Sequence, residues 1–468
     1  MPLLGPSKLP DRSSRWRLLA LICFVVLVQD FAEYIARAPQ IEIWIEIVAR
    51  KLCPGVQDGS GCMDLVQSEV ALLEGWKDTL EQVPGILFAV PYGVLADRIG
   101  RRPVLLLCAV GFTLSDVWVK IVCWFSDQLP LRLIWLAPIA EVVGGGTQVA
   151  TSIMFVMLAD LFNDEDQTTA FLYVSATALL SEILATPLGT LLMTRNVWLP
   201  YILSSVGTAG GGLFLLLLPE TLPQAPPSSP SGTSREEEAD KGNIPDRVRA
   251  GVDELRRSTA VIRRHRSVQL FLFVFFAAYL GRQVMKVLLL FAANRFHWTI
   301  AQASFLISVR GFTNLLLLIV ILPGLSRWLL RRWNMTPLSK DTSLALTSSA
   351  CLCVGCLLIA VSVHPVGAVL GLVVFALGSA MHLLARRIIT SLVDAHHLGT
   401  LYTAIAVMQG IGVVVAGPTM AMAYGWGLAQ GGVWTGAPFL LVAGLFGAAG
   451  MAILLGSWEE GRGDLESG

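Results

Sequence analysis

The chain has 468 residues, of which 54% are hydrophobic and only 15% are charged, and its mean hydropathy is +0.65. A soluble domain carries charge on about a quarter of its residues, so this composition indicates a membrane protein. The formal net charge is zero, which gives no support to a nucleic-acid partner.

Twelve apolar stretches are long enough to cross a bilayer as helices, which takes about 20 residues each. The first stretch is too long for the core of a signal peptide and lacks a clear cleavage site, so we count it as a span. The sequence therefore predicts an all-α polytopic membrane protein with twelve transmembrane helices. The predicted spans are residues 17–37, 77–97, 103–125, 133–159, 168–192, 197–218, 267–293, 301–325, 343–363, 366–388, 400–425 and 433–456.

The connection after the first span, near residues 38–74, is predicted as a long extracellular loop. It contains Cys53 and Cys62, which are separated by eight residues, whereas the other six cysteines fall inside predicted spans. Two cysteines on the oxidising side of a membrane can form a disulfide, which we expect here. Two free thiols are the alternative.

Ionisable residues inside a bilayer are costly, and they usually face a partner or a functional site. Asp30 and Glu33 share one face of the first span, close enough to its outer end to be hydrated. Acidic residues cluster in the first six spans and basic residues in the last six. The candidate cavity or coupling residues are Asp30, Glu33, Glu141, Glu182, Arg282, Lys286 and Arg310.

Two interpretations are open for Glu182 and Asp30. In the first, the carboxylate binds and releases a proton and thereby couples a proton gradient to transport. In the second, it forms a structural ion pair with Arg282, Lys286 or Arg310 across the interface between the two halves of the chain.

Residues 219–266 interrupt the pattern of spans, because this segment is rich in proline, serine and charge and is typical of a flexible linker. It separates six spans in residues 1–218 from six spans in residues 267–468. Two bundles joined by a central cytosolic loop are the layout of transporters whose substrate site lies between the halves.

Most of the 34 lysines and arginines lie in segments that share one side of the membrane if the N-terminus is inside. Because positive residues favour the cytosolic side, we expect both termini in the cytosol. We expect the plasma membrane as the location, with the vacuolar membrane as the alternative.

A compact charged turn, GVLADRIGRRPVL from Gly93 to Leu105, joins the second and third spans. Its glycines, acid and arginines resemble the signature of major facilitator superfamily transporters at this position. The segments VQSEVALLEGW, VPGILFAVPYG, PLGTLLM, PET, ANRFHWTIAQAS and AGPTMAMAYGWG extend the resemblance to fungal members that export drugs and secondary metabolites.

The resemblance implies a conformational latch at this turn, made in one state of the transport cycle and broken in the other. Asp97 would interact with the positive end of the eleventh span, which starts near Leu401. The arginines would bind anionic lipid headgroups, and the glycines would permit a tight turn and close helix approach. The latch would consist of Gly93, Asp97, Arg98, Gly100, Arg101 and Arg102.

The leading hypothesis is a proton-coupled secondary active transporter that exports a small organic compound by alternating access. Proton-coupled uptake of a small organic solute and a non-transporting membrane sensor are the alternatives. The sequence contains neither a nucleotide-binding loop nor a metal-ligand cluster, so we expect no enzyme and no cofactor. The expected partners are a small-molecule substrate, protons and membrane lipid, without nucleic acid, and the protein is expected to be a monomer.

Overall fold

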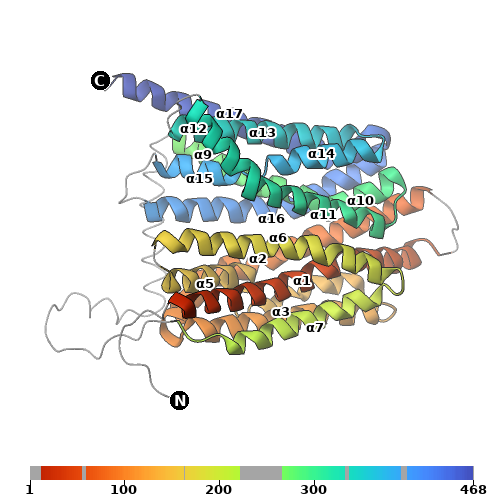
Figure 1. Cartoon of the computed structure of the whole chain (residues 1–468). Helices are drawn as coiled ribbons and strands as arrows, with labels where there is room; N and C mark the ends of the chain where they lie inside the picture. The colour runs from red at the N-terminus through yellow and green to blue at the C-terminus, as the bar shows by residue number, and fades with distance from the viewer. Residues whose placement is uncertain are drawn as a thin grey trace, which may run out of the picture.

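The computed structural model describes residues 12–54, 60–162, 164–221, 266–332, 337–391 and 398–466. These ranges are almost entirely helical and contain no strand, and twelve helical segments within them are long and apolar enough to cross a membrane. The predicted all-α fold with twelve transmembrane helices is therefore confirmed. In Figure 1, α1 begins and α17 ends on the same side, which we call the termini face.

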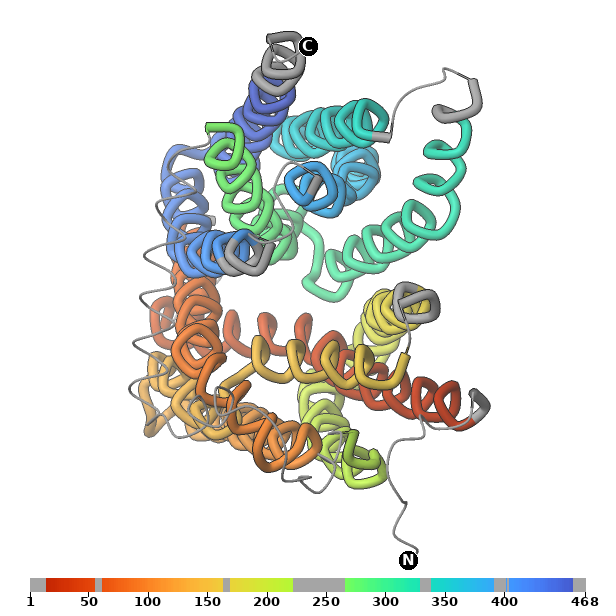
Figure 2. The backbone as a smooth tube through the Cα atoms, turned by 90° about the vertical axis from the view of Figure 1, so that its left-hand side faces the viewer, coloured from red at the N-terminus to blue at the C-terminus, as the bar shows by residue number. Residues whose placement is uncertain are grey.

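The helices form two bundles that lie one above the other in Figure 2, which looks onto the termini face. The linker predicted at residues 219–266 lies outside the described residues except for 219–221 and Arg266. The first bundle contains α1 (Arg12–Leu52), α2 (Ser60–Ile99), α3 (Arg101–Trp124), α4 (Pro138–Glu141), α5 (Gly146–Leu161), α6 (Asp164–Met193) and α7 (Trp198–Phe214). The second contains α9 (Arg266–Arg282), α10 (Val284–Phe296), α11 (Ile300–Leu316), α12 (Leu322–Arg332), α13 (Pro337–Val361), α14 (Pro365–Leu377), α15 (Met381–Ser391), α16 (Leu398–Gln430) and α17 (Ala437–Glu466).

The long loop predicted near residues 38–74 is wrong, because α1 and α2 continue through most of it as helix. With 41 residues at 1.5 Å each, α1 is about 60 Å long, whereas the hydrocarbon core of a bilayer is about 30 Å thick. Hydropathy detects the part of a helix that lies in lipid, and charges such as Arg37, Glu42 and Glu46 end that signal without ending the helix. Only residues 53–59 lie between the two helices.

Several predicted spans are interrupted helices. The fourth consists of a 3-10 turn at Leu131–Leu136 followed by α4 and α5, and three consecutive glycines lie at the start of α5, the third of them as its first residue. Gly144, Gly145 and Gly146 have φ angles of 97°, 82° and 75°, a region that side chains other than glycine rarely adopt. The seventh span breaks between α9 and α10, and the tenth between α14 and α15.

The two bundles touch mainly along two helix pairs, α2 with α16 and α6 with α11, and less extensively where α11 meets α1 and α10 meets α2. The closest approach lies where Gly75 of α2 meets Gly417 of α16, since a Cβ atom on either glycine would collide with the carbonyl oxygen of the other. Small residues allow two helix backbones to approach in this way. The Thr79 hydroxyl of α2 also donates to the carbonyl oxygen of Val414 at 2.8 Å.

Gly417→Val should lower the free energy of unfolding by about 1–3 kcal/mol, because the new side chain has no space between α2 and α16. The thermal midpoint of the purified protein measures this effect. Gly410→Val on the same helix is the control, since its Cβ would meet Ile86 at an ordinary distance of 3.5 Å. Equal midpoints for the two variants would contradict the assigned contact.

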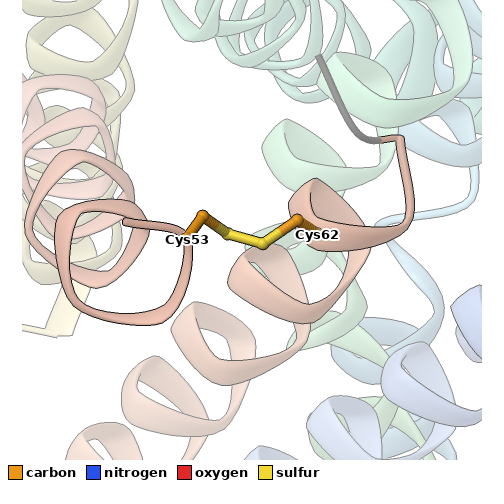
Figure 3. Close-up of a disulfide and its surroundings, with 2 residues drawn as sticks. All are labelled: Cys53 and Cys62. Carbon is orange, nitrogen blue, oxygen red and sulfur yellow. A yellow bond between two sulfur atoms is a disulfide. The ribbon is translucent and has the colours of Figure 1, made fainter. Parts of the chain in front are cut away.

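A disulfide joins Cys53, at the end of α1, to Cys62, in the first turn of α2, and their Cα atoms are 6.4 Å apart (Figure 3). The bond connects the two long helices opposite the termini face, and we call this side the disulfide face. Lys51 also donates to the carbonyl oxygen of Ser126 at 2.5 Å, which holds the end of α1 against the end of α3.

Cys53→Ser should lower the free energy of unfolding by about 2–3 kcal/mol, the value for opening a loop of roughly ten residues. It should also leave the Cys62 thiol reactive toward a membrane-impermeant maleimide added to intact cells, while the unaltered protein is labelled only after reduction. Cys351→Ser, which removes a free cysteine of α13, is the control and should give no such labelling. Labelling that requires permeabilised cells would place the disulfide face in the cytosol.

Candidate functional site between the two bundles

An ion pair between Glu182 of α6 and Arg310 of α11 joins the two bundles. The Glu182 side chain is only 3% exposed, and its Oε1 accepts from both Nη2 and Nε of Arg310, the latter at 3.2 Å. Both residues lie far from the helix ends, at the level where α6 and α11 pack together. A charge pair at this depth is costly unless each partner satisfies the other.

A second ion pair crosses the interface between α10 and α2, where Lys286 lies 2.7 Å from Asp78. Closer to the disulfide face, the Asn294 side chain of α10 donates to Asp64 of α2 at 2.7 Å. Arg282, which precedes Lys286 by one helical turn, instead lies over the ring of Tyr279, 5.5 Å from its centroid. Of the three predicted bases, two therefore pair with acids of the first bundle.

Asp30 and Glu33 lie near the middle of the 41-residue helix α1, so their predicted position near its outer end is wrong. Glu33 forms an ion pair with Arg37 at 2.6 Å, one turn further along α1. Asp30 lies within electrostatic range of Glu33, Arg37 and Glu182. The acids of α1 therefore belong to the same charged region as the Glu182–Arg310 pair.

Glu141 is buried at the end of α4, with 5% exposure, just before the run of glycines. Its Oε1 accepts from the Ser115 hydroxyl of α3 at 3.0 Å, and its Oε2 has no hydrogen-bond partner within the described part of the chain. The glycines bring α4 close to α3, since a Cβ on Gly111 would collide with the carbonyl oxygen of Val143. The fold thus holds an incompletely satisfied carboxylic acid group inside the first bundle.

Several functional candidates on α1 and α2 were missed from the sequence. Lys77 and Glu81 form an ion pair along α2, and both belong to the electrostatic surroundings of Glu141. Arg37 ends the predicted first span, whereas in the structure it lies in the middle part of α1 and pairs with Glu33. The signal that could have revealed the α2 group is the spacing of Glu74, Lys77, Asp78 and Glu81, which places them on adjoining turns of one helix.

Together these residues form a charged site at the interface of the bundles, in which the first bundle supplies the acids and both bundles supply bases. Charged residues that are paired across a movable interface can lose their partners when the interface opens. A carboxylate that loses its basic partner can bind a proton in its place. The arrangement therefore suits a binding site for a polar solute that is coupled to proton binding.

The charged turn connects α2 and α3 at the termini face. Asp97 pairs with Arg101, whose Nε also lies 3.4 Å from Asp160 at the end of α5. Arg98 is exposed, and Arg102 donates to the carbonyl oxygen of Leu216 at 2.6 Å. The turn is therefore tied to both α5 and the end of α7, while the predicted contact of Asp97 with the start of α16 stays a prediction.

Glu220, in the PET segment after α7, is a member of this turn that the sequence did not identify. Its carboxylate accepts from the backbone amides of Arg101 at 2.8 Å and Arg102 at 3.1 Å, which satisfies the N-terminus of α3. Gly100 has a φ of 111°, and a Cβ there would collide with Glu220. Gly93 meets no described atom within 4 Å of its would-be Cβ, so the close helix approach expected of it is wrong in this conformation.

Comparison with known proteins gives matches over most of the chain. A family model described as Major Facilitator Superfamily matches residues 71–417. The efflux pump ustT of Aspergillus flavus is 35% identical over 426 residues, which cover 87% of this chain and 82% of that protein. The MFS efflux pump atnC of Emericella nidulans is 31% identical over 458 residues, which cover 94% and 87%.

Solved structures of transporters share the fold. A bacterial homologue of the human lysosomal transporter Spinster, in an inward-facing and unoccupied conformation, has a TM-score of 0.63 at 13% identity, covering 96% of this chain and 98% of that chain. The nucleoside transporter NupG has a TM-score of 0.63 at 14% identity, covering 94% and 98%.

Proposed function

Because the chain belongs to the Major Facilitator Superfamily, we propose that it exports a small organic compound by alternating access, driven by the proton gradient. The resemblance inferred from the sequence motifs is confirmed, and the relatives are transporters rather than enzymes. Export is supported by the names of the relatives, two of which are efflux pumps.

The observation that carries the proposal is the Glu182–Arg310 ion pair. Alternating access requires the two bundles to separate on one side and to close on the other. Within the described residues, the ion-pair partner of the Glu182 carboxylate belongs to the opposite bundle, so separation of the bundles would remove that partner and favour protonation of Glu182. In the proposed cycle, a proton replaces Arg310 as the partner of Glu182 in one conformation of the transporter. The proton is released in the other conformation, in which Glu182 pairs with Arg310 again.

We further propose that the described conformation is closed at the disulfide face. Closure at the disulfide face is supported by contacts between the outer parts of α2 and α16. One of them is the hydrogen bond that the Tyr424 hydroxyl donates to the Gln67 side chain at 3.0 Å. Toward the termini face, Val90 of α2 and Val407 of α16 are 65% and 46% exposed. With the termini in the cytosol, as the distribution of arginines and lysines favours, this conformation faces inward.

The moving units of this proposal are residues 1–218 and 267–468, joined by residues 219–266 in the cytosol. The protein would act as a monomer in the plasma membrane, with the vacuolar membrane as the alternative location. Its substrate would bind among the charges between the bundles, in contact with α1, α2, α6, α10 and α11.

Transport by the purified full chain in sealed vesicles tests the proposal, with small organic compounds and fluorescent organic dyes as probes. An exporter that exchanges protons for substrate accumulates the probe in vesicles that are acidic inside. A symporter accumulates it in vesicles that are alkaline inside, which would favour uptake. Accumulation that is insensitive to a protonophore would contradict proton coupling, and a complete lack of transport under either gradient would favour a sensor.

A further inference from the structure

Arg282 lies at the middle of the seventh span, Arg266–Phe296, and its side chain is exposed. Within the part of the chain that the structure describes, no carboxylate lies within ion-pair distance of its guanidinium, which lies over the ring of Tyr279. A ring face attracts a cation more weakly than a carboxylate does. Charged residues at this depth almost always pair with one another or mark a substrate pathway, so Arg282 points to a ligand.

Arg282 faces the space between the two bundles. Lys286 follows it by one turn and therefore lies on the same side of the span, and Lys286 reaches Asp78 of α2 in the first bundle. Gly281 instead faces into the second bundle, since a Cβ there would collide with the ring of Phe446 of α17. Because α9 begins at the termini face (Figure 1), Arg282 is one turn closer than Lys286 to the open side of the proposed conformation.

Tyr279 and His382 provide aromatic rings beside Arg282. The two rings are in edge contact, with centroids 6.3 Å apart, although Tyr279 belongs to α9 and His382 to α15. His382 lies within electrostatic range of both Arg282 and Arg386, and Arg386 is one turn further along α15. This wall of the second bundle therefore combines positive charge with aromatic surface.

The acids of the first bundle that form ion pairs with the second bundle do not neutralise this wall. Asp78 pairs with Lys286 at 2.7 Å, and Glu182 pairs with Arg310. Among the described residues, the positive charge of Arg282 is therefore left without an acidic partner. An anionic group of a bound compound would satisfy it.

The seventh span also breaks at this point, because α9 ends at Arg282 and α10 begins at Val284. A helix that begins inside the membrane directs the partial positive charge of its N-terminus toward the residues before it. Interrupted helices of transporters place such N-termini against the anionic groups of their substrates. The break thus adds to the positive potential at Arg282.

We propose that the transported compound is an organic acid whose carboxylate binds to Arg282 at the start of α10. This inference rests on the proposed function and names the class of its substrate. The planar guanidinium offers two parallel N–H groups that match the two oxygens of a carboxylate. An aromatic group next to the carboxylate would contact the rings of Tyr279 and His382.

Binding of aromatic carboxylic acids to the purified full chain tests this assignment without a proton gradient. The probes are fluorescent acids that carry a pyrene or naphthalene ring, each matched with its primary amide and titrated at a pH where the acid is ionised. The acids should bind roughly tenfold or more tightly than their amides, because their hydrogen bonds to Arg282 are charge-assisted. Equal binding of acid and amide, or no saturable binding of any acid, would overturn the proposal.

Arg282→Gln should abolish this preference for acids, and Arg282→Lys should keep part of it, because lysine retains the charge without the fork of N–H groups. Arg195→Gln is the matched control and should keep the full preference, since Arg195 is an exposed arginine between α6 and α7 at the disulfide face. A preference that survives in Arg282→Gln would assign the carboxylate to another residue.

The thermal midpoint of the unliganded protein excludes a purely structural role. Arg282→Gln should leave the midpoint unchanged or raise it, because the substitution removes a charge without an acidic partner from the middle of a span. A lower midpoint would show that Arg282 balances an acid of the protein, and this outcome would overturn the proposal.

Binding at equilibrium depends neither on proton coupling nor on the direction of transport. Loss of the preference for acids would therefore remove only the assigned substrate class. Failure of gradient-driven accumulation in vesicles would instead remove the proposed function and leave the binding result standing.

Discussion

Glu182→Gln is expected to reduce proton-driven accumulation of substrate roughly tenfold or more while exchange of substrate across the membrane continues. Glutamine retains the size of the side chain but can neither carry the charge that binds Arg310 nor release a proton. The bundles can still rock and bind substrate, so only the link to the proton gradient is lost. Counterflow and gradient-driven uptake, measured on the same vesicles, separate these two activities.

The variant leaves Arg310 without its partner, and breaking a buried ion pair can destabilise a protein by about 3–5 kcal/mol. The double variant Glu182→Gln with Arg310→Gln removes both charges and should recover folding without recovering coupling. Glu46→Gln, which affects an exposed ion pair with Arg50 near the end of α1, is the matched control and should accumulate substrate normally. If Glu182→Gln accumulates substrate with unaltered pH dependence, Glu182 is structural and coupling must be sought at Asp30, Glu33 or Glu141.

Asp97→Asn is expected to slow transport by about tenfold without preventing folding or membrane insertion. Asp97 neutralises Arg101, and Arg101 also contacts Asp160, so the aspartate helps to fix the end of α2 against α3 and α5. Asparagine is similar in shape but cannot balance the guanidinium, so the turn would no longer hold one conformation of the bundle strongly. Initial rates and the amount of protein in the membrane should be measured together.

Asp127→Asn is the matched control, because Asp127 is an exposed aspartate that pairs with Arg50 at 3.6 Å on the disulfide face. It should transport at the normal rate. A normal rate for Asp97→Asn as well would mean that the turn only anchors the protein to the cytosolic side. Glu220→Gln gives an independent comparison, since Glu220 binds the backbone amides of the same turn but does not pair with Asp97.

The fold class followed from local composition. Twelve long apolar runs leave few alternatives to a bundle of transmembrane helices. In a bilayer the backbone N–H and C=O groups must form their hydrogen bonds within each helix. The motif from Gly93 to Leu105 identified the family because its glycines and charges have a fixed order along the chain. Some ion pairs also join residues of a single helix turn, as between Asp116 and Lys120, which are four residues apart on α3.

The extent of α1 and α2 and the partners of the buried charges were decided only by tertiary structure. Hydropathy detects the part of a helix that lies in lipid, so the first span was predicted to end at Arg37, although α1 continues to Leu52. The sequence offered three bases as partners for Glu182, and only the packing of α6 against α11 selects Arg310. Ion pairs between residues more than 100 positions apart depend on how helices cross, because each helix presents several faces and the local pattern does not specify which face meets which neighbour.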